Sequence, residues 1–230
     1  FDVMIFATKD INFKIYKVIL FVIIITGLAF SFSFAFNNIK QKQELLSKNK
    51  KSNFSVQDGD VIFQSSYSKQ SQAVEIATNS KYSHCGIIFI ENNVPYVYEA
   101  VQPVGKRKLA DWISSGVDQT CVIKRFKGID TLSKKSLLRM KEYAASQFGK
   151  NYDGYFSWTD KEMYCSELAY KAYKAIGIEL CPTKSLREFN LESPQVRKMM
   201  QQRYGSQIPY DEPMVSPGQL SESKLLYLIQ

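Results

Sequence analysis

Histidine is nearly absent from this sequence: 230 residues contain one, His84. Any chemistry that needs an imidazole therefore has a single source. Cysteine is also scarce, with four residues at positions 85, 121, 165 and 181 and no Cys-x-x-Cys pair. A zinc site would need mostly cysteine and carboxylate ligands, so we expect no bound metal and no other cofactor. In an oxidising compartment the four cysteines permit three full disulfide pairings and require none.

Acidic residues are fewer than basic ones, 22 against 30, which gives a formal net charge of +8. The imbalance lies largely in residues 1–53, where eight basic residues accompany three acidic ones, whereas the rest of the chain carries 22 and 19. A nearly balanced domain without a basic stripe is not typical of a nucleic-acid-binding surface, so we expect no nucleic-acid partner. The basic residues near the N-terminus suit anionic lipid headgroups better.

Charge is missing altogether from Val18 to Phe36, nineteen residues that run VILFVIIITGLAFSFSFAF. This length can cross the hydrocarbon core of a bilayer, and we predict a single-pass transmembrane anchor. A cleaved secretion signal is the alternative, because it also pairs a basic start with an apolar middle. Lysines lie on both sides, so the positive-inside rule does not decide the orientation. An N-terminal anchor before one globular domain favours an extracytoplasmic location, in the cell envelope.

The composition divides the chain into an N-terminal flank (1–17), the apolar segment (18–36), a polar linker (37–53) and one globular domain (54–230). Hydrophobic residues make up 45% of the chain, which is enough for a real core. Short apolar runs bounded by turn residues predict strands at 61–63, 85–90, 94–100, 120–126 and 225–229. Apolar residues at helical spacing predict helices around 73–77, from Ser133 to Gly149 and over 163–176.

Two of these strands are joined by a short polar segment with two asparagines, Asn92 and Asn93, which tolerate the positive φ of a tight turn. A two-residue turn at this place predicts a hairpin in which Gly86 lies opposite Glu99. Residues two apart in a strand share a face. We therefore expect His84 and Glu99 to be diagonal neighbours, roughly 5 to 8 Å apart at the β-carbon and within reach of each other's side chains.

The helix expected over 163–176 carries Cys165 on its apolar stripe, with the side chain turned inward near the helix start. A helix N-terminus and an adjacent imidazolium both stabilise a thiolate and lower its pKa. The segment 159–162, Thr-Asp-Lys-Glu, has the pattern of a capping box, which would begin the helix earlier and place Cys165 nearly two turns inside it. We predict instead that the helix begins at Met163 or Tyr164.

Cys165, His84 and Glu99 together form the constellation that a thiol nucleophile needs. The carboxylate accepts from one ring nitrogen and so sets the tautomer and orientation of the histidine. Each residue also has a structural alternative. Cys165 would be a small buried hydrophobe, His84 a structural residue beside a strand, and Glu99 an ordinary carboxylate at the end of an exposed strand.

Six short motifs follow one another along the chain: Gly59-Asp60-Val61-Ile62-Phe63-Gln64, Tyr82-Ser83-His84, Tyr98-Glu99, Tyr152-Asp153, Tyr164-Cys165-Ser166-Glu167-Leu168 and Ser216-Pro217-Gly218-Gln219-Leu220. Together they resemble the YiiX/YaeF-like permuted NlpC/P60 family, whose members are circularly permuted papain-like proteins. The resemblance spans about residues 56–228 and leaves the N-terminal apolar segment out. The order His, polar residue, Cys makes it specific, because papain itself has its cysteine first.

This resemblance implies an α+β, permuted papain-like (NlpC/P60) fold, a small antiparallel β-barrel or sheet packed against helices. It also implies Cys165 as nucleophile, His84 as general base and then general acid, and Glu99 as the residue that orients the histidine, with a thioester intermediate. The substrate stays open, because relatives of this permuted class act on peptide amides and on lipid acyl groups alike.

The oxyanion of such a reaction needs hydrogen-bond donors. The backbone N–H of Cys165, at the helix start, is the natural first donor. A second donor could be the side chain of Gln64 or the hydroxyl of Tyr164. Both residues also suit structural roles, Tyr164 as a packing aromatic and Gln64 as a polar residue at a strand end.

The sequence therefore predicts a papain-like thiol hydrolase, an amidase or peptidase that acts on cell-envelope peptide or amide substrates. Two alternatives stay open: a thiol-dependent lipid acyl-hydrolase or acyltransferase, and a catalytically silent, membrane-tethered binding module. Long aliphatic side chains in the groove would favour a lipid, and acidic or amide-rich walls a peptide. Loss of Cys165, His84 or Glu99 would have been the signature of a silent module, and all three are present.

Overall fold

The computed structural model describes residues 55–229. The flank (1–17), the expected transmembrane anchor (18–36) and the linker (37–53) lie outside the described residues, so the anchor and its orientation stay predictions. Within 55–229, no helix has the length and apolar character that a membrane span requires.

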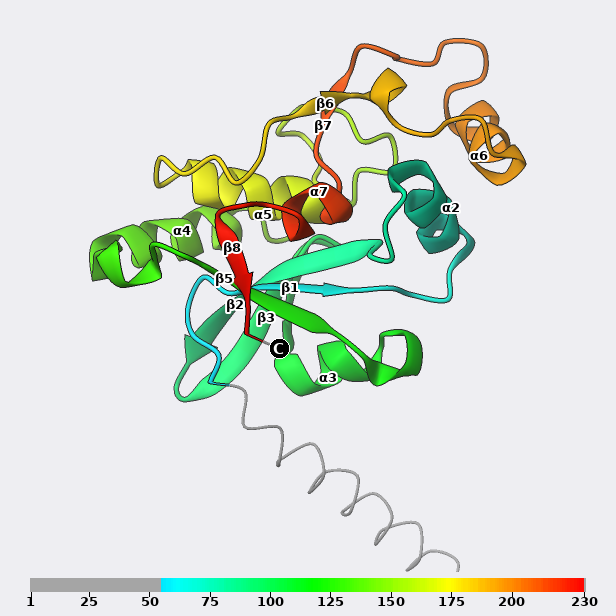
Figure 1. Cartoon of the computed structure of the whole chain (residues 1–230). Coiled ribbons are helices and arrows are strands. Elements are labelled where there is room, and N and C mark those ends of the chain that lie inside the picture. Colours follow the sequence, from blue (N-terminus) through cyan, green and yellow to red (C-terminus); the bar gives the residue numbers. More distant parts are fainter. Residues whose placement is uncertain (1–54, 230) are drawn as a thin grey trace, which may run out of the picture. The chain divides into compact units, whose positions relative to one another are not determined.

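Six strands form one antiparallel sheet in the order β4-β3-β2-β1-β5-β8 (Figure 1). The strands are β1 (Val61–Gln64), β2 (His84–Glu91), β3 (Val94–Glu99), β4 (Gly105–Lys108), β5 (Val122–Phe126) and β8 (Leu226–Leu228). A barrel would need a ladder between the outermost strands, but in the described part of the chain β4 and β8 lie at opposite edges. The sheet is therefore open, and the expectation of a small barrel is wrong. A second sheet pairs β6 (Lys184–Ser185) with β7 (Pro213–Met214).

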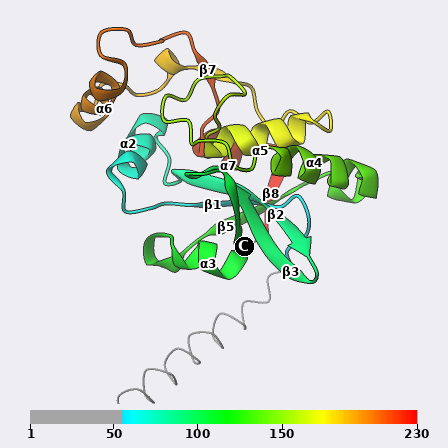
Figure 2. The ribbon, with the colours of Figure 1, turned by 180° about the vertical axis from the view of Figure 1, so that it is seen from behind.

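Helices cover both faces of the six-stranded sheet. They are α2 (Lys69–Thr78), α3 (Leu109–Ser114), α4 (Lys134–Ser146), α5 (Cys165–Lys174), α6 (Pro194–Tyr204) and α7 (Pro217–Ser221), with short 3-10 helices η1 (Val117–Gln119), η2 (Ile129–Thr131) and η3 (Leu186–Glu188). Both views show α4 and α5 on one face and α3 on the other (Figures 1 and 2). This arrangement confirms the α+β class, with an antiparallel sheet packed against helices.

The pleat of the central strands separates two hydrophobic cores. Val61 and Phe63 of β1 belong to the core that α4 and α5 complete, together with Leu168. Ile62, between them in sequence, belongs to the core on the other face and packs there with Trp112 of α3. Because consecutive residues are buried on opposite faces, β1 is a continuous apolar run rather than an alternating one.

The hairpin of β2 and β3 forms with the turn and register that the sequence predicts. Asn92 and Asn93 have φ angles of 50° and 64°, which is the left-handed conformation of a tight hairpin turn. Ile87 pairs with Tyr98 in the ladder. The predicted register is therefore confirmed, and it directs the first residue of β2 toward the last residue of β3.

Helix α5 begins at Cys165, and Tyr164 is its N-cap. The predicted start is thus correct to within a residue, and the capping-box pattern at 159–162 does not begin a helix. The reason lies in the preceding segment, where Met163 forms an isolated parallel bridge with Tyr152. An extended residue engaged in a bridge cannot be part of a helix, so α5 starts two residues later.

Several elements were not predicted: β4, α3 and α6, together with the short β6, β7, α7 and the 3-10 helices. β4 reads Gly-Lys-Arg-Lys and has no apolar residue, and α3 is only six residues long. α6 lies in the segment after Pro182 that has no regular apolar pattern, and it packs on α2. A third core between these two helices also includes Tyr164 and Met214. The residues of this third core form one wall of the space beside the start of α5.

Candidate active site

Cys165 is the first residue of α5, and only 4% of its surface is exposed. Polar contacts hold this helix start: the Glu167 carboxylate accepts from the backbone N–H of Tyr164 at 3.3 Å, and Ser166 Oγ donates to the carbonyl of Val215 at 2.7 Å. The first N–H groups of a helix have no intrahelical partner, and the helix dipole favours negative charge beside them. A thiolate at Cys165 is therefore stabilised by its position.

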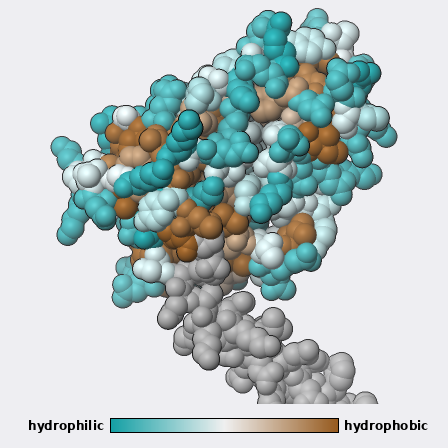
Figure 3. Space-filling model, viewed as in Figure 1, coloured by the Kyte–Doolittle hydropathy of each residue, from teal (hydrophilic) through white to brown (hydrophobic). Residues whose placement is uncertain are grey.

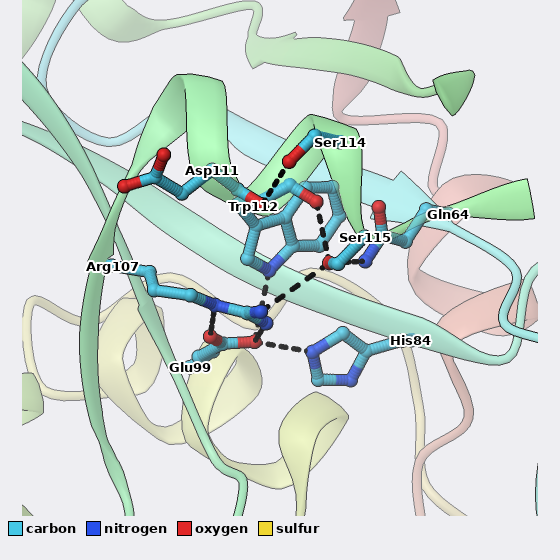
Figure 4. A network of polar contacts seen from close by, with 8 residues as sticks. All are labelled: Gln64, His84, Glu99, Arg107, Asp111, Trp112, Ser114 and Ser115. Carbon is cyan, nitrogen blue, oxygen red and sulfur yellow. Dashed lines mark hydrogen bonds and ion pairs between the residues drawn. The ribbon is translucent and has the colours of Figure 1, made fainter. Parts of the chain in front are cut away.

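His84 is the first residue of β2, and its imidazole is held on two sides. Its Nε2 lies 2.6 Å from Oε2 of Glu99, and its ring stacks on the indole of Trp112 with centroids 5.7 Å apart. An ionised carboxylate only accepts hydrogen bonds, so Nε2 carries the hydrogen and Nδ1 is the basic nitrogen. Figure 4 shows this second nitrogen on the side of the ring away from Glu99.

Glu99 ends β3, and its side chain is 1% exposed. Arg107 donates to Oε1 through Nε at 2.6 Å and to Oε2 through Nη2 at 3.0 Å, and Trp112 Nε1 donates to Oε2 at 2.9 Å (Figure 4). Burial raises the pKa of Glu99, but its contacts with His84 and Arg107 outweigh burial and hold the pKa below its usual range. Glu99 is thus a buried, paired carboxylate and not an ordinary exposed one.

The protonation states favour an ion pair between Cys165 and His84. Burial lowers the pKa of His84, but hydrogen bonding and charge from Cys165 and Glu99 raise that pKa to about 9. The pKa of Cys165 is held well below its usual range, first by a hydrogen bond from the Cys85 side chain and then, against burial, by His84. A thiolate and an imidazolium therefore coexist near neutral pH.

Cys85 was not predicted to belong to the site. It follows His84 on β2, and alternation along the strand turns its side chain to the opposite face, where it lies in the same core as Cys165. Burial raises the pKa of Cys85 well above its usual range, so it stays a thiol that can donate. All four cysteines are free. The adjacent residues His84 and Cys85 thus both hydrogen-bond to the side chain of Cys165.

Arg107 and Trp112 were also missed, because neither β4 nor α3 was predicted. One signal could have found Arg107. If a second hairpin follows β3, the register that pairs Glu99 with Gly105 places Arg107 diagonally from Glu99 on the same face. Trp112 has no comparable signal, since it reaches Glu99 from a helix on the surface of the sheet.

The two predicted second donors to an oxyanion border the site from different sides. Gln64 pairs with His84 across β1 and β2, and its Nε2 lies 3.4 Å from Oγ of Ser115. Its Oε1 is buried and has no hydrogen-bond partner among the described residues. The hydroxyl of Tyr164 accepts from the backbone N–H of Val215 at 3.3 Å. The Tyr164 hydroxyl thus keeps its own hydrogen, whereas the Gln64 amide nitrogen is already directed at a serine.

An apolar pocket reaches Cys165 from the side of α2, α6 and β7. Its walls are mainly aliphatic, aromatic and small side chains, among them Leu186, Leu191, Val196, Met199 and Met200. Figure 3 shows hydrophobic residues between α2 and α6, framed by hydrophilic ones. Arg203 is the one charged residue that lines the pocket in the described part of the chain. The space beside the thiol therefore suits an apolar group.

Three findings relate this chain to known proteins. A sequence model of permuted papain-like amidase enzymes, the YaeF/YiiX or C92 family, matches residues 55–230. The chain is 43% identical over 162 residues to the uncharacterized protein YiiX of Escherichia coli (strain K12), a match that covers 70% of this chain and 79% of the relative. A crystal structure described as the metalloprotein yiiX of Escherichia coli O157:H7 has a TM-score of 0.72 and 39% identity, and covers 76% of this chain and 96% of that one.

The description of that relative as a metalloprotein raises the question of a metal here. Between residues 55 and 229, no group of three or more histidine, cysteine, aspartate or glutamate side chains could hold a metal ion. Glu99, the carboxylate that contacts His84, already contacts the Arg107 guanidinium through both oxygens, and this positive charge opposes a cation. The residues at the site do not fit a metal.

Proposed function

We propose that this chain, which belongs to the permuted papain-like amidases of the YaeF/YiiX type, is a thiol hydrolase. Cys165 is the nucleophile, His84 the general base and acid, and Glu99 the residue that orients His84. The observation that carries the proposal is the 2.6 Å contact between Nε2 of His84 and the buried Glu99, beside a cysteine whose pKa is held well below its usual range. Such an arrangement argues against a catalytically silent binding module.

In the first half of the reaction, the Cys165 thiolate attacks the carbonyl carbon of an amide or ester. A C–S bond forms and the carbonyl electron pair moves to the oxygen, where the backbone N–H of Cys165 donates to it. Gln64 or Tyr164 supplies the second donor. The tetrahedral intermediate then expels its amine or alcohol, which takes a proton from Nδ1 of His84, and a thioester remains.

In the second half, water attacks the thioester carbonyl and gives a proton to Nδ1 of His84. The C–S bond breaks, the acid product leaves and the ion pair between Cys165 and His84 is restored. An alcohol or amine in place of water would give acyl transfer instead. Glu99 stays ionised throughout, because Arg107 and Trp112 donate to it in addition to His84.

The pocket supports the acyl-lipid alternative for the substrate. A peptide site was expected to have acidic or amide-rich walls, and a lipid site long aliphatic ones. The walls next to Cys165 are aliphatic and aromatic, with Leu186, Leu191 and Met199 among them. The proposed substrate is therefore an amide or ester with an apolar acyl group, and cell-envelope peptides or amides are the second candidate. A membrane anchor at 18–36, with the domain outside the cytoplasm, would place either substrate within reach.

Activity profiling of the full chain in detergent tests this proposal. An electrophilic acyl probe with an eight- to twelve-carbon chain and a peptide-type electrophile of equal reactivity are compared, with Cys165→Ala as the loss variant. We expect labelling at Cys165, faster with the acyl probe, and loss of turnover in His84→Ala with the fold retained. Cys121→Ala is the matched control, because burial raises the pKa of Cys121 to about 11. Labelling of neither probe, or turnover retained in His84→Ala, would refute the thiol-hydrolase function.

A further inference from the structure

Among residues 55–229, Arg203 is the only cation that lines the apolar pocket, and its polar contacts are few. Its guanidinium carbon lies 4.7 Å from the ring centre of Phe156, and its Nη2 donates to Oε1 of Gln70 at 3.0 Å. Gln70 in turn donates through Nε2 to the hydroxyl of Tyr152 at 3.0 Å. No ion pair within residues 55–229 includes Arg203.

The other arginines of the domain are different. Arg107 and Arg125 are paired with the buried carboxylates of Glu99 and Asp60. Arg187 and Arg197, at the surface next to the pocket, have carboxylate partners in Asp211 and Glu192. Arg139 has no carboxylate partner in the described part of the chain, but it is exposed on α4. Among these six arginines, Arg203 alone is half-buried in the apolar pocket without an ion pair to any residue of 55–229.

A guanidinium in this position has unused donors. It presents five N–H groups in a planar fork that matches a carboxylate or a phosphate. One of them is directed at the neutral amide of Gln70. A charge beside apolar walls is costly unless an opposite charge compensates it. The natural partner is therefore an anionic group that enters the pocket with the ligand.

Arg203 and Cys165 both lie close to Tyr152, and Gln70 connects Arg203 to the Tyr152 hydroxyl through two hydrogen bonds. Burial raises the pKa of Tyr152 well above its usual range, the charge at Cys165 raises it further, and the charge of Arg203 lowers it. Tyr152, Cys165 and Arg203 all line the same pocket. An anion on Arg203 would thus lie near the scissile bond rather than at the far end of an acyl chain.

We infer that Arg203 binds a carboxylate or phosphate group of the substrate, so that the pocket accepts an anionic amphiphile. The apolar chain packs against the aliphatic walls, and the negative charge pairs with the guanidinium on one side of the scissile amide or ester. This inference deepens the proposed function and rests on it. Arg203 is then a residue that determines specificity, since it selects acyl compounds with a charge near the reacting carbonyl over neutral ones.

Two matched substrate pairs test the inference with the full chain in detergent. N-decanoyl-alanine and its neutral amide, N-decanoyl-alaninamide, represent a carboxylate. Decanoyl-glycerol 3-phosphate and decanoyl-glycerol represent a phosphate. We expect the anionic member of at least one pair to be preferred, and the pair that shows it identifies the source of the charge. Arg203→Met should raise the KM for that anionic substrate by about 10- to 100-fold, the effect of losing a charge-assisted hydrogen bond.

The controls separate charge recognition from a structural role. Arg203→Met should lower kcat/KM for the anionic member far more than for the neutral one, and Arg203→Lys should restore part of the preference. Arg197→Met removes an exposed arginine that is paired with Glu192, and it should leave both substrates unaffected. Equal losses for anionic and neutral substrates in Arg203→Met would mean that Arg203 only supports the fold and would overturn the inference. Equal turnover of both members by the parent protein would overturn it as well.

Binding to Cys165→Ala distinguishes failure of the inference from failure of the proposed function. Calorimetry with N-decanoyl-alanine and decanoyl-glycerol 3-phosphate should show binding that Arg203→Met weakens in the double variant. Binding of this kind without turnover by the parent protein would support the role of Arg203 while refuting the hydrolase. Probe labelling at Cys165 without any preference for the anionic compounds would refute the role of Arg203 alone.

Discussion

The indole of Trp112 lies nearly parallel to the imidazole of His84, with an interplanar angle of 23°. Its Nε1 also donates at 2.9 Å to Oε2 of Glu99, the same oxygen that His84 contacts. One side chain therefore supports the ring and the carboxylate that orients it. The orientation of His84 depends on α3 as well as on the hairpin.

Trp112→Phe should keep most of the stacking and remove the donor. A hydrogen bond to a charged group contributes about 1.5–3 kcal/mol. We expect kcat to fall about tenfold with a small change in KM, because Trp112 is fully buried and does not line the pocket. Steady-state kinetics on an acyl substrate would measure this. Trp158→Phe is the control, since Trp158 packs over Lys171 at 4.7 Å and is not a partner of Glu99. Equal kinetics in the two variants would contradict a role for Trp112 in orientation.

The pH dependence of kcat/KM should show an alkaline limb near pH 9. The active form needs a Cys165 thiolate, present above its lowered pKa, and a His84 imidazolium, which is lost as the pH rises through about 9. Glu99 is one of the two groups that raise the pKa of His84, so Glu99→Gln should move the alkaline limb to lower pH and reduce kcat. A limb that stays in place would show that Glu99 does not control the protonation of His84.

The hairpin explains why the contact between His84 and Glu99 could be predicted from the sequence. Two asparagines fixed the turn, the turn fixed the register, and the register brought His84 and Glu99 to 2.6 Å. The start of α5 was also predictable, although a local capping pattern at 159–162 competed with it. Each of these features depends on residues close in sequence, or on the pairing of two neighbouring strands that can be recognised from their own residues.

The remaining parts of the site depend on contacts between distant segments. Arg107 is in a strand without apolar residues, which forms because β3 offers a free edge. The apolar pocket combines α2, η3, α6 and β7, and α6 lies in a segment where no helical pattern was recognised. Of the two expected alternatives, barrel or sheet, the barrel was wrong for a similar reason, because whether the edge strands β4 and β8 meet is not a local property.

The close approach of β2 and β3 leaves no room for a side chain at Gly86. A Cβ there would lie 2.8 Å from the carbonyl oxygen of Tyr98 and 2.4 Å from a methyl group of Val97. Gly86→Ala should therefore push β3 away from β2, lengthen the contact between His84 and Glu99, and cost about 1–3 kcal/mol of unfolding free energy. We expect lower kcat and a lower Tm. Gly154→Ala, where nothing lies within 4 Å of the new Cβ, is the control and should change neither; similar behaviour of the two variants would contradict this account.

The buried ion pair of Asp60 and Arg125 should matter for stability and not for catalysis. Asp60 is fully buried and accepts from Nε and Nη2 of Arg125, both at 2.8 Å, and it joins the start of β1 to β5. Removal of one partner leaves a buried charge unpaired, so Asp60→Ala should lower the free energy of unfolding by about 3–5 kcal/mol. Asp211→Ala also breaks an Asp–Arg pair, with Arg187, but both side chains are exposed, and it should have little effect. Urea denaturation of the two variants would measure the difference, and equal midpoints would show that burial does not strengthen the Asp60 pair.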